Sequence, residues 1–151
     1  MKMSMTVLID TNVLVYASDP SDRARQERAL QVLKALDFNG SGRLSAQNLA
    51  EFLHATTRTR RPLYTRAQAL SQVERLMRSF PVFDLTSLIV LEAGRCARDY
   101  SLAYYDAQVW ATAHVNQVPV IFSEDFNPGQ VLEGVRFTNP FVPGFRIEDW
   151  S

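Results

Sequence analysis

Four acidic residues, far apart in the sequence, carry the chemistry that this chain suggests: Asp10, Glu51, Asp106 and Asp125. No lysine or arginine adjoins any of the four in sequence. If the fold gathers them, repulsion between their carboxylates makes the cluster costly unless a cation holds it. Magnesium and manganese prefer such oxygen ligands, and a metal held in this way can activate water against a phosphodiester. The four acids therefore predict a metal-dependent hydrolytic site, provided that the fold brings them together.

Each acid also has a simpler structural interpretation, which the sequence leaves open. In this interpretation, the sole role of Asp10 is to cap the helix that follows it. Glu51 and Asp106, near the starts of helices, can interact favourably with the helix dipole, and Asp125 can belong to a turn. The joint pattern is more informative than any one member, so the decision depends on where the secondary structure places the four residues.

The elements that must position these acids follow from apolar periodicity and from turn residues. The expected strands are 7–9, 43–45, 81–85, 118–122 and an edge strand at 135–137. The expected helices are a short turn at 13–17 and longer segments at 23–36, 47–59, 66–79, 87–100 and 106–116. Residues 139–151 are expected to form a tail packed on the surface.

This alternation predicts the α/β class, as a three-layer α/β/α domain with a mostly parallel central sheet spanning residues 1–151. The apolar strand at 7–9 is typical of a central strand buried on both faces. If strand 118–122 runs parallel to it, Asp10 and Asp125 lie at the same edge of the sheet, where α/β proteins bind ligands. The longer helices are expected to bury apolar stripes that include Leu30, Leu33, Leu70, Met77, Leu88 and Leu91.

Composition narrows the possibilities further. The 151 residues include 16 basic and 16 acidic ones, so the net charge gives no global attraction to nucleic acid, and any such binding must use local patches. The single cysteine, Cys96, excludes an intramolecular disulfide framework and a cysteine zinc site. No apolar run approaches the roughly 20 residues that span a bilayer, and the start shows no signal-peptide core. We therefore expect a cytoplasmic protein with no membrane segment.

Short motifs around the four acids resemble those of the PIN-domain ribonucleases, in particular the VapC-type toxins of toxin–antitoxin pairs. The motifs are Leu8-Ile9-Asp10-Thr11-Asn12, Glu51 within a helix, Tyr105-Asp106-Ala107, Ser123-Glu124-Asp125-Phe126 and Asn139-Pro140-Phe141. The resemblance covers residues 7–141. Its Asp-Thr-Asn and Tyr-Asp-Ala motifs are fairly specific together and weak apart.

The resemblance implies an endoribonuclease that depends on magnesium or manganese, forms homodimers and is inhibited by a small antitoxin. By resemblance the four acids would be the catalytic metal ligands, with polar support from Asn12 and Ser123. Glu124 departs from the commonest toxin pattern, which leaves open whether Glu124 or Asp125 is the fourth acid. The RNA that is cut and the number of metal ions are not implied.

Basic residues and histidines elsewhere have several interpretations. Arg58, Arg60 and Arg61 could hold RNA phosphates beside the acids, form a solvated loop, or contact an acidic antitoxin segment. His54 and His114 lie on expected helices without a partner at metal-ligand spacing. We interpret both histidines as structural.

Two alternative functions compete with a nuclease. A haloacid-dehalogenase-type phosphatase also has an aspartate after its first strand, but it needs a second aspartate where Asn12 stands and a late lysine, and no lysine follows Lys34 here. A catalytically inactive RNA- or partner-binding module of the same fold is the other alternative, against which the presence of all four acids argues. An aryl phosphate assay tests the first alternative, and a divalent-metal titration tests the second.

Overall fold

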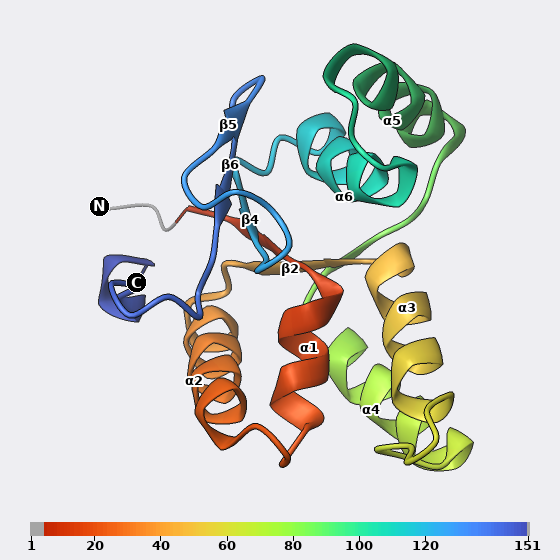
Figure 1. Ribbon diagram of the computed structural model, residues 1–151, viewed down its shortest axis with the longest axis vertical. Helices are drawn as coiled ribbons and strands as arrows, with labels where there is room; N and C mark the ends of the chain where they lie inside the picture. The colour runs from red at the N-terminus through yellow and green to blue at the C-terminus, as the bar shows by residue number, and fades with distance from the viewer. Residues whose placement is uncertain (1–4, 151) are drawn as a thin grey trace.

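The structure, a computed structural model that describes residues 5–150, is a twisted sheet with helices on both sides (Figure 1). Within those residues the strands are β1 (Val7–Ile9), β2 (Gly42–Ser45), β3 (Val82–Phe83), β4 (Val120–Phe122), β5 (Val131–Leu132) and β6 (Val135–Thr138). The helices there are α1 (Thr11–Ser18), α2 (Arg23–Asn39), α3 (Ala46–Thr57), α4 (Arg66–Ser79), α5 (Ser87–Tyr100), α6 (Tyr104–Val115) and the 3-10 helix η1 (Ile147–Trp150). The predicted α/β class is confirmed.

The sheet has β1 at its centre, in the order β3-β2-β1-β4-β6-β5. β1 pairs in parallel with β2 on one side and with β4 on the other, so Val7 lies opposite Val120 and Ile9 opposite Phe122. β6 continues the parallel arrangement beside β4, whereas the short hairpin of β5 and β6 is antiparallel. Because β1 and β4 are parallel, the chain leaves both strands at the same edge of the sheet, as the sequence predicts.

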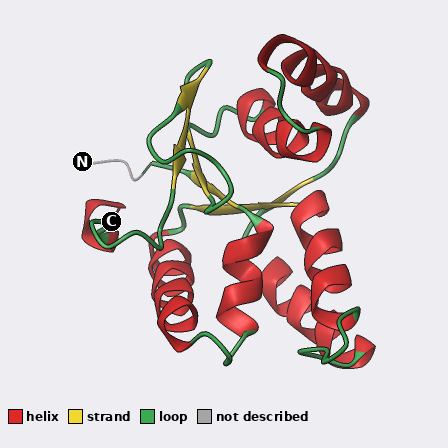
Figure 2. Cartoon of the chain, in the orientation of Figure 1, coloured by secondary structure: helices red, strands yellow, loops and turns green. Residues whose placement is uncertain are grey.

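The two faces of the sheet are covered by different groups of helices. Val7 and Ile9 face a core built with α1–α4, and Leu8 faces a core built with α5 and α6. Figure 2 shows this separation, with the pair of α5 and α6 on one side of the yellow strands and the other long helices opposite. The fully buried, apolar β1 is therefore sandwiched between two helical layers, which confirms the predicted three-layer arrangement.

The predicted helices are present, but several of the predicted buried stripes are wrong. Leu70 and Met77 in α4, and Leu88 and Leu91 in α5, are more than half exposed. Leu30 in α2 is also half exposed, and Leu33 is only partly buried. Val73 in α4 and Cys96 in α5 are buried as expected, and the two helices also bury Ala69, Ile89 and Ala93. Small residues on those faces allow closer packing of the helices, and periodicity alone does not choose between two apolar faces.

Two further segments differ in extent from the prediction. The strand expected at 81–85 is reduced to the two residues of β3, at the edge of the sheet. The predicted tail does pack on the molecule, and it adds a helical turn, η1. The Trp150 ring in this turn packs edge-on against the Phe122 ring, with 4.9 Å between the ring centroids. No helix in residues 5–150 is long and apolar enough to cross a membrane.

Candidate metal centre

Asp10 lies at the carboxyl end of β1 and is almost fully buried. Its Oδ1 atom accepts a hydrogen bond from the backbone N–H of Thr11 at 2.8 Å, so the side chain does cap α1. Its Oδ2 atom accepts from the hydroxyl of Ser123, which follows β4, at 2.8 Å. Capping of α1 accounts for the hydrogen bond of Oδ1 alone. The second oxygen, Oδ2, links the end of β1 to the residue that follows β4.

Asn12 and Ser123, the two predicted supporting residues, connect Asp10 to Asp125. The Asn12 side-chain amide donates to the Ser123 hydroxyl oxygen and to Asp125 Oδ2, both at 3.0 Å. The backbone N–H of Asp125 also donates to the Ser123 hydroxyl oxygen, at 3.1 Å. The parallel strands thus bring two of the predicted acids to one place, with a serine and an asparagine between them.

Glu51 approaches the same edge from α3. The Thr11 hydroxyl lies 3.5 Å from Glu51 Oε2, and the Gln47 side-chain amide donates to Glu51 Oε1 at 2.7 Å. The Asn48 side-chain amide donates to Asp10 Oδ1 at 3.3 Å and to the Thr11 hydroxyl at 3.2 Å. A chain of neutral polar groups therefore joins Glu51 to Asp10.

Thr11, Gln47 and Asn48 belong to this site although the sequence analysis did not select them. Asn48 is fully buried and is held by a reciprocal capping box with Ser45 at the start of α3. A signal was available, because Ser45 and Asn48 have the spacing of a capping box and Gln47 stands four residues before Glu51, on the same helix face. These spacings indicate helix capping and side-chain pairing within a helix, and they do not by themselves indicate a functional site.

Asp106 reaches the cluster from the first turn of α6 and is half-buried. Among the described residues its carboxylate has no hydrogen-bond partner and no ion pair. Burial, and then the negative charge of Asp125, raise the pKa of Asp106 above its ordinary value. The influence of Asp125 shows that these two acids lie within electrostatic range of each other.

The pKa of Asp10 is also raised, mainly by burial and in part by the negative charges of neighbouring acids. Burial raises the pKa of Asp10 to about 6; the hydrogen bonds from Ser123 and Thr11 act in the opposite direction, and the charges of Asp125 and Glu51 add to the increase. Within residues 5–150 no lysine, arginine or histidine forms an ion pair with any of the four acids. The cluster therefore lacks an internal counter-charge.

The donor set suits a hard divalent cation. Its candidate ligands are carboxylate oxygens, and no cationic side chain of the described part of the chain competes for them. In that part the structure does not gather three acidic, histidine or cysteine side chains closely enough to form a ready-made ligand set. Magnesium usually keeps several of its waters and uses only one or two carboxylates directly, so an open arrangement of acids fits such an ion.

Glu124 has partners that separate it from the other acids. The Tyr16 hydroxyl donates to Glu124 Oε1, and the Arg25 guanidinium lies 3.3 Å from Oε2. The hydrogen bond to Glu124 is the main reason that the pKa of Tyr16 is raised, to about 12. Both oxygens of Glu124 are thus engaged, whereas Asp125 is exposed and its carboxylate accepts a hydrogen bond only from Asn12 among the described residues. The geometry favours Asp125 as the fourth acid.

The predicted basic residues and His114 do not join the acids. Arg58 ends α3, about 10 Å along the helix from Glu51, and Arg60 and Arg61 are exposed in the loop that follows, at the end of α3 away from the sheet (Figure 1). His114 stacks on Trp110 at 4.6 Å, in agreement with a structural role. His54 differs from our expectation, because it is exposed and lines a hollow of about 370 Å³ together with Thr11 and Glu51.

Comparison with known proteins supplies the family. The PIN domain family matches residues 7–131 of the chain. No curated protein sequence matches it. Solved structures with a similar fold include VapBC2 from Rickettsia felis bound to a promoter DNA fragment, with a TM-score of 0.66 and 14% identity over 89% of this chain and 98% of that one.

Two other similar structures come from toxin–antitoxin systems. A toxin–antitoxin complex from Klebsiella pneumoniae has a TM-score of 0.66 and 18% identity, over 89% of this chain and 98% of that one. Mycobacterium tuberculosis VapC20, described as a Sarcin-Ricin loop cleaving toxin, has a TM-score of 0.64 and 20% identity, over 87% of this chain and 99% of that one. At these identities the likeness shows a shared fold.

Proposed function

The chain belongs to the PIN domain family, and we propose that it is a divalent-metal-dependent endoribonuclease that acts as the toxin of a type II toxin–antitoxin pair. The observation that carries the proposal is the acidic cluster at the carboxyl edge of β1 and β4. Its members come from four separate elements, and none of them forms an ion pair with a basic side chain in the described residues. Hydrolysis of a phosphodiester by a metal-dependent site needs such a set of unneutralised oxygen ligands.

Asp10, Asp106, Asp125 and Glu51 are the residues that would hold the ion. Bound there, Mg²⁺ or Mn²⁺ would supply positive charge for the phosphate and would acidify a water for attack. Because the pKa of Asp10 is about 6, its carboxylate is largely ionised at neutral pH. Ser123, Asn12 and the other neutral donors orient the carboxylates without cancelling their charge.

The reaction proposed is in-line hydrolysis of an RNA phosphodiester. Attack of water on phosphorus expels the 3′-oxygen, so the products carry a 5′-phosphate and a 3′-hydroxyl. Asp106 is the acid best suited to accept a proton from the attacking water, because its carboxylate has no hydrogen-bond partner among the described residues. The other common route to RNA cleavage uses a general base, often histidine, and gives a 2′,3′-cyclic phosphate. His54 is the candidate for that route, since it lies beside Glu51.

The proposed RNA substrate and antitoxin partner take support from the structural neighbours. VapC20 is described as cleaving the Sarcin-Ricin loop, and other neighbours are described as VapBC or toxin–antitoxin complexes. Leu88 and Leu91 expose apolar surface on α5, as expected for a chain that forms a homodimer or binds a partner. The family match does not support the haloacid dehalogenase alternative, which an aryl phosphate assay would check.

The test is cleavage of a panel of end-labelled single-stranded and stem–loop RNAs. We expect cleavage with magnesium or manganese, none with EDTA, and product ends that carry 5′-phosphate and 3′-hydroxyl. Cleavage by the His54→Ala variant should be retained. Products with 2′,3′-cyclic phosphate, or cleavage undiminished by EDTA, would contradict the mechanism. Metal binding without cleavage of any RNA would favour the inactive binding module instead.

A further inference from the structure

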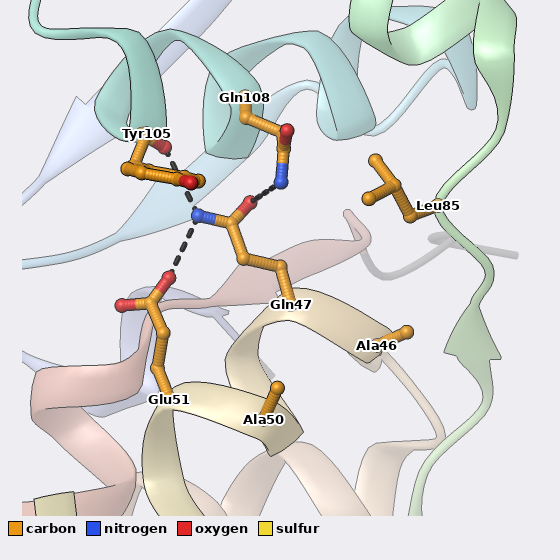
Figure 3. A pocket seen from close by; sticks show the side chains of 7 residues that line it. All are labelled: Ala46, Gln47, Ala50, Glu51, Leu85, Tyr105 and Gln108. Carbon is orange, nitrogen blue, oxygen red and sulfur yellow. Dashed lines mark hydrogen bonds between the residues drawn. The ribbon is translucent and has the colours of Figure 1, made fainter. Parts of the chain in front are cut away.

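A chain of side-chain hydrogen bonds crosses from α6 to α3 and ends on Glu51 (Figure 3). The Tyr104 hydroxyl donates to Gln108 Oε1 at 2.9 Å, and the Gln108 amide donates to Gln47 Oε1 at 3.0 Å. The Gln47 amide then donates to Glu51 Oε1 at 2.7 Å and to the backbone carbonyl of Tyr105 at 3.1 Å. All but the Tyr104 link can be followed in Figure 3.

The direction of this chain is fixed by its acceptors. The carboxylate of Glu51 and the carbonyl of Tyr105 can only accept, so both N–H groups of Gln47 are committed to them. The remaining oxygen of Gln47 faces Gln108, which must therefore present its amide nitrogen. Gln47 and Gln108 are only 8% and 4% exposed. One orientation of both amides satisfies every group, and reversing either would bury an unpaired donor or acceptor.

The two glutamines lie where the helices are otherwise separated. α6 packs mainly on α5, and α3 packs mainly on α1 and α4. Between α3 and α6 lies a cavity of about 540 Å³, whose walls include the apolar side chains of Ala46, Ala50 and Leu85. The amides of Gln47 and Gln108 meet across this space in Figure 3. Hydrogen bonds in an apolar setting are stronger than in water, so this bridge ties α3 to α6.

The bridge connects the helices that carry two of the four acids. It ends directly on Glu51 of α3, and it also binds the carbonyl of Tyr105, the residue before Asp106 in α6. Glu51 itself is exposed, and a free glutamate of this kind samples several rotamers. An amide restrains the carboxylate while leaving its full negative charge, whereas lysine or arginine in its place would compete with a bound cation.

We propose that Gln47 and Gln108 are positioning residues of the acidic centre, which hold the Glu51 carboxylate in place relative to Asp106 for binding of a divalent ion. The proposal deepens the proposed function and rests on it. Gln47 acts directly on Glu51, and Gln108 acts through Gln47. Removal of Gln47 should therefore have the larger effect, and neither residue should matter once Glu51 can no longer bind the ion.

The experiment is a double-mutant cycle with Mn²⁺ affinity, measured by calorimetry, as the readout. Gln47→Leu should weaken Mn²⁺ binding by about tenfold, as loss of an outer support typically does, and Gln108→Leu should weaken it less. In a Glu51→Gln background, adding Gln47→Leu should change little, because the two residues act as one unit. Gln26→Leu is the matched control, since Gln26 donates to the carbonyl of Ala17 on α1, away from the acids.

Three results would overturn the positioning role. The first is additive losses of Mn²⁺ affinity from Gln47→Leu and Glu51→Gln in the double-mutant cycle. The second is a loss of affinity in Gln26→Leu equal to that in Gln47→Leu, and the third is absence of Mn²⁺ binding by the wild type. A metal-free measurement guards against misfolded variants: the side-chain amide NMR signals of Gln47 should shift in Glu51→Gln and in Gln108→Leu but not in Gln26→Leu. Signals of Gln47 that match those of an exposed glutamine would also overturn it.

RNA cleavage separates this proposal from the proposed function. If Gln47→Leu lowers kcat with little change in KM, both are supported, because the amide acts on a metal-binding acid and not on RNA. If the cycle behaves as expected but no RNA is cut, the positioning role stands and the ribonuclease proposal fails. If RNA is cut equally well by wild type and Gln47→Leu, the ribonuclease stands and the positioning role fails.

Discussion

Two clusters of acidic side chains in the described residues differ in the presence of a counter-charge and in burial. On the face covered by α5, Arg95 binds Glu92, Asp99 and Glu133 at 2.5, 3.6 and 3.0 Å. Hydrogen bonds from Arg95 are the largest cause that lowers the pKa values of Glu92 and Glu133. This second group, which we name the Arg95 cluster, therefore contains a counter-charge of its own and joins α5 to the β5–β6 turn.

The acidic centre at the edge of β1 and β4 shows the opposite behaviour. Asp10 and Asp106 have raised pKa values, because they are buried near other carboxylates and no cation of the described residues pairs with them. The fold thus pairs acids with an arginine in one place and leaves them without a basic partner among the described residues in the other. This difference is what a centre that takes up a cation from outside the chain, as proposed, would require.

The largest effect is expected from Asp106→Asn. Loss of this carboxylate should lower RNA cleavage by about 100-fold or more, since metal-held charge contributes several kcal/mol to such reactions. The fold should be retained or slightly more stable at neutral pH, because the substitution removes a half-buried negative charge near Asp125. Cleavage rate and melting temperature measure the two effects. Glu92→Gln, in the Arg95 cluster, is the control and should cleave normally.

The second prediction concerns pH. The pKa of Asp10 is raised from 3.8 to about 6, so the folded protein holds this proton more tightly than the unfolded chain. The free energy of unfolding of the metal-free protein should therefore fall as pH rises through about 4 to 6. The total loss, reached once the pH is above about 6, should be about 3 kcal/mol. Denaturation in EDTA, compared between wild type and Asp10→Asn, isolates this slope, and magnesium should reduce the loss at neutral pH. A difference between the two proteins that does not change with pH would refute it.

A smaller effect, confined to stability, is expected when the Arg95 cluster is broken. Arg95→Met keeps an aliphatic contact over Trp110 but removes the guanidinium, so the melting temperature should fall by a few degrees while cleavage and Mn²⁺ binding stay unchanged. The pKa values of Glu92 and Glu133 are lowered, so their stabilisation exists above their ordinary pKa and disappears as pH falls. The difference in melting temperature should accordingly shrink in acid. Loss of metal binding in this variant would remove the contrast between the clusters.

The smallest effect is expected at Glu124. Because Tyr16 and Arg25 occupy its carboxylate, Glu124→Gln should change Mn²⁺ affinity by less than about twofold. Asp125→Asn, one residue later, should weaken it by about tenfold or more. The pair is measured under identical conditions by calorimetry. The reverse order of effects would make Glu124 the fourth acid.

Much of the fold and half of the site follow from the sequence. β1 and β4 are predictable because each is a run of three apolar residues that ends at a polar turn. Such a short, fully apolar run is typical of a buried strand. Their parallel pairing then places Asp10 beside Asp125. The buried faces of α4 and α5 were predicted only in part: Val73 and Cys96 are buried as expected, but both helices have apolar residues on more than one face, and tertiary packing decides which is covered.

The polar support of the site was predicted only in part, since Asn12 and Ser123 were selected from the sequence but the amides on α3 and α6 were not. The long-range hydrogen bonds of Gln47, Asn48 and Gln108 join partners 37 to 61 residues apart, and no local pattern encodes such contacts. The bond from Gln47 to Glu51, four residues away, is local, but its spacing alone does not indicate a site. The role of Glu124 could not be separated from that of Asp125 for the same reason, because Tyr16 and Arg25 reach it only in the folded chain. Neutral groups inside a recognisable motif, such as Asn12, could be selected from the sequence, whereas Gln47, Asn48 and Gln108, outside any motif, became visible only in three dimensions.

The most direct test of the central claim is a calorimetric titration of Mn²⁺ into three proteins at neutral pH: wild type, Asp10→Asn and Glu92→Gln. The acidic centre should bind the ion in the wild type, bind it at least about tenfold more weakly in Asp10→Asn, and bind it unchanged in Glu92→Gln. Equal binding by wild type and Asp10→Asn, or a matching loss in Glu92→Gln, would contradict the claim that the centre at the edge of β1 and β4 is built to hold a divalent cation.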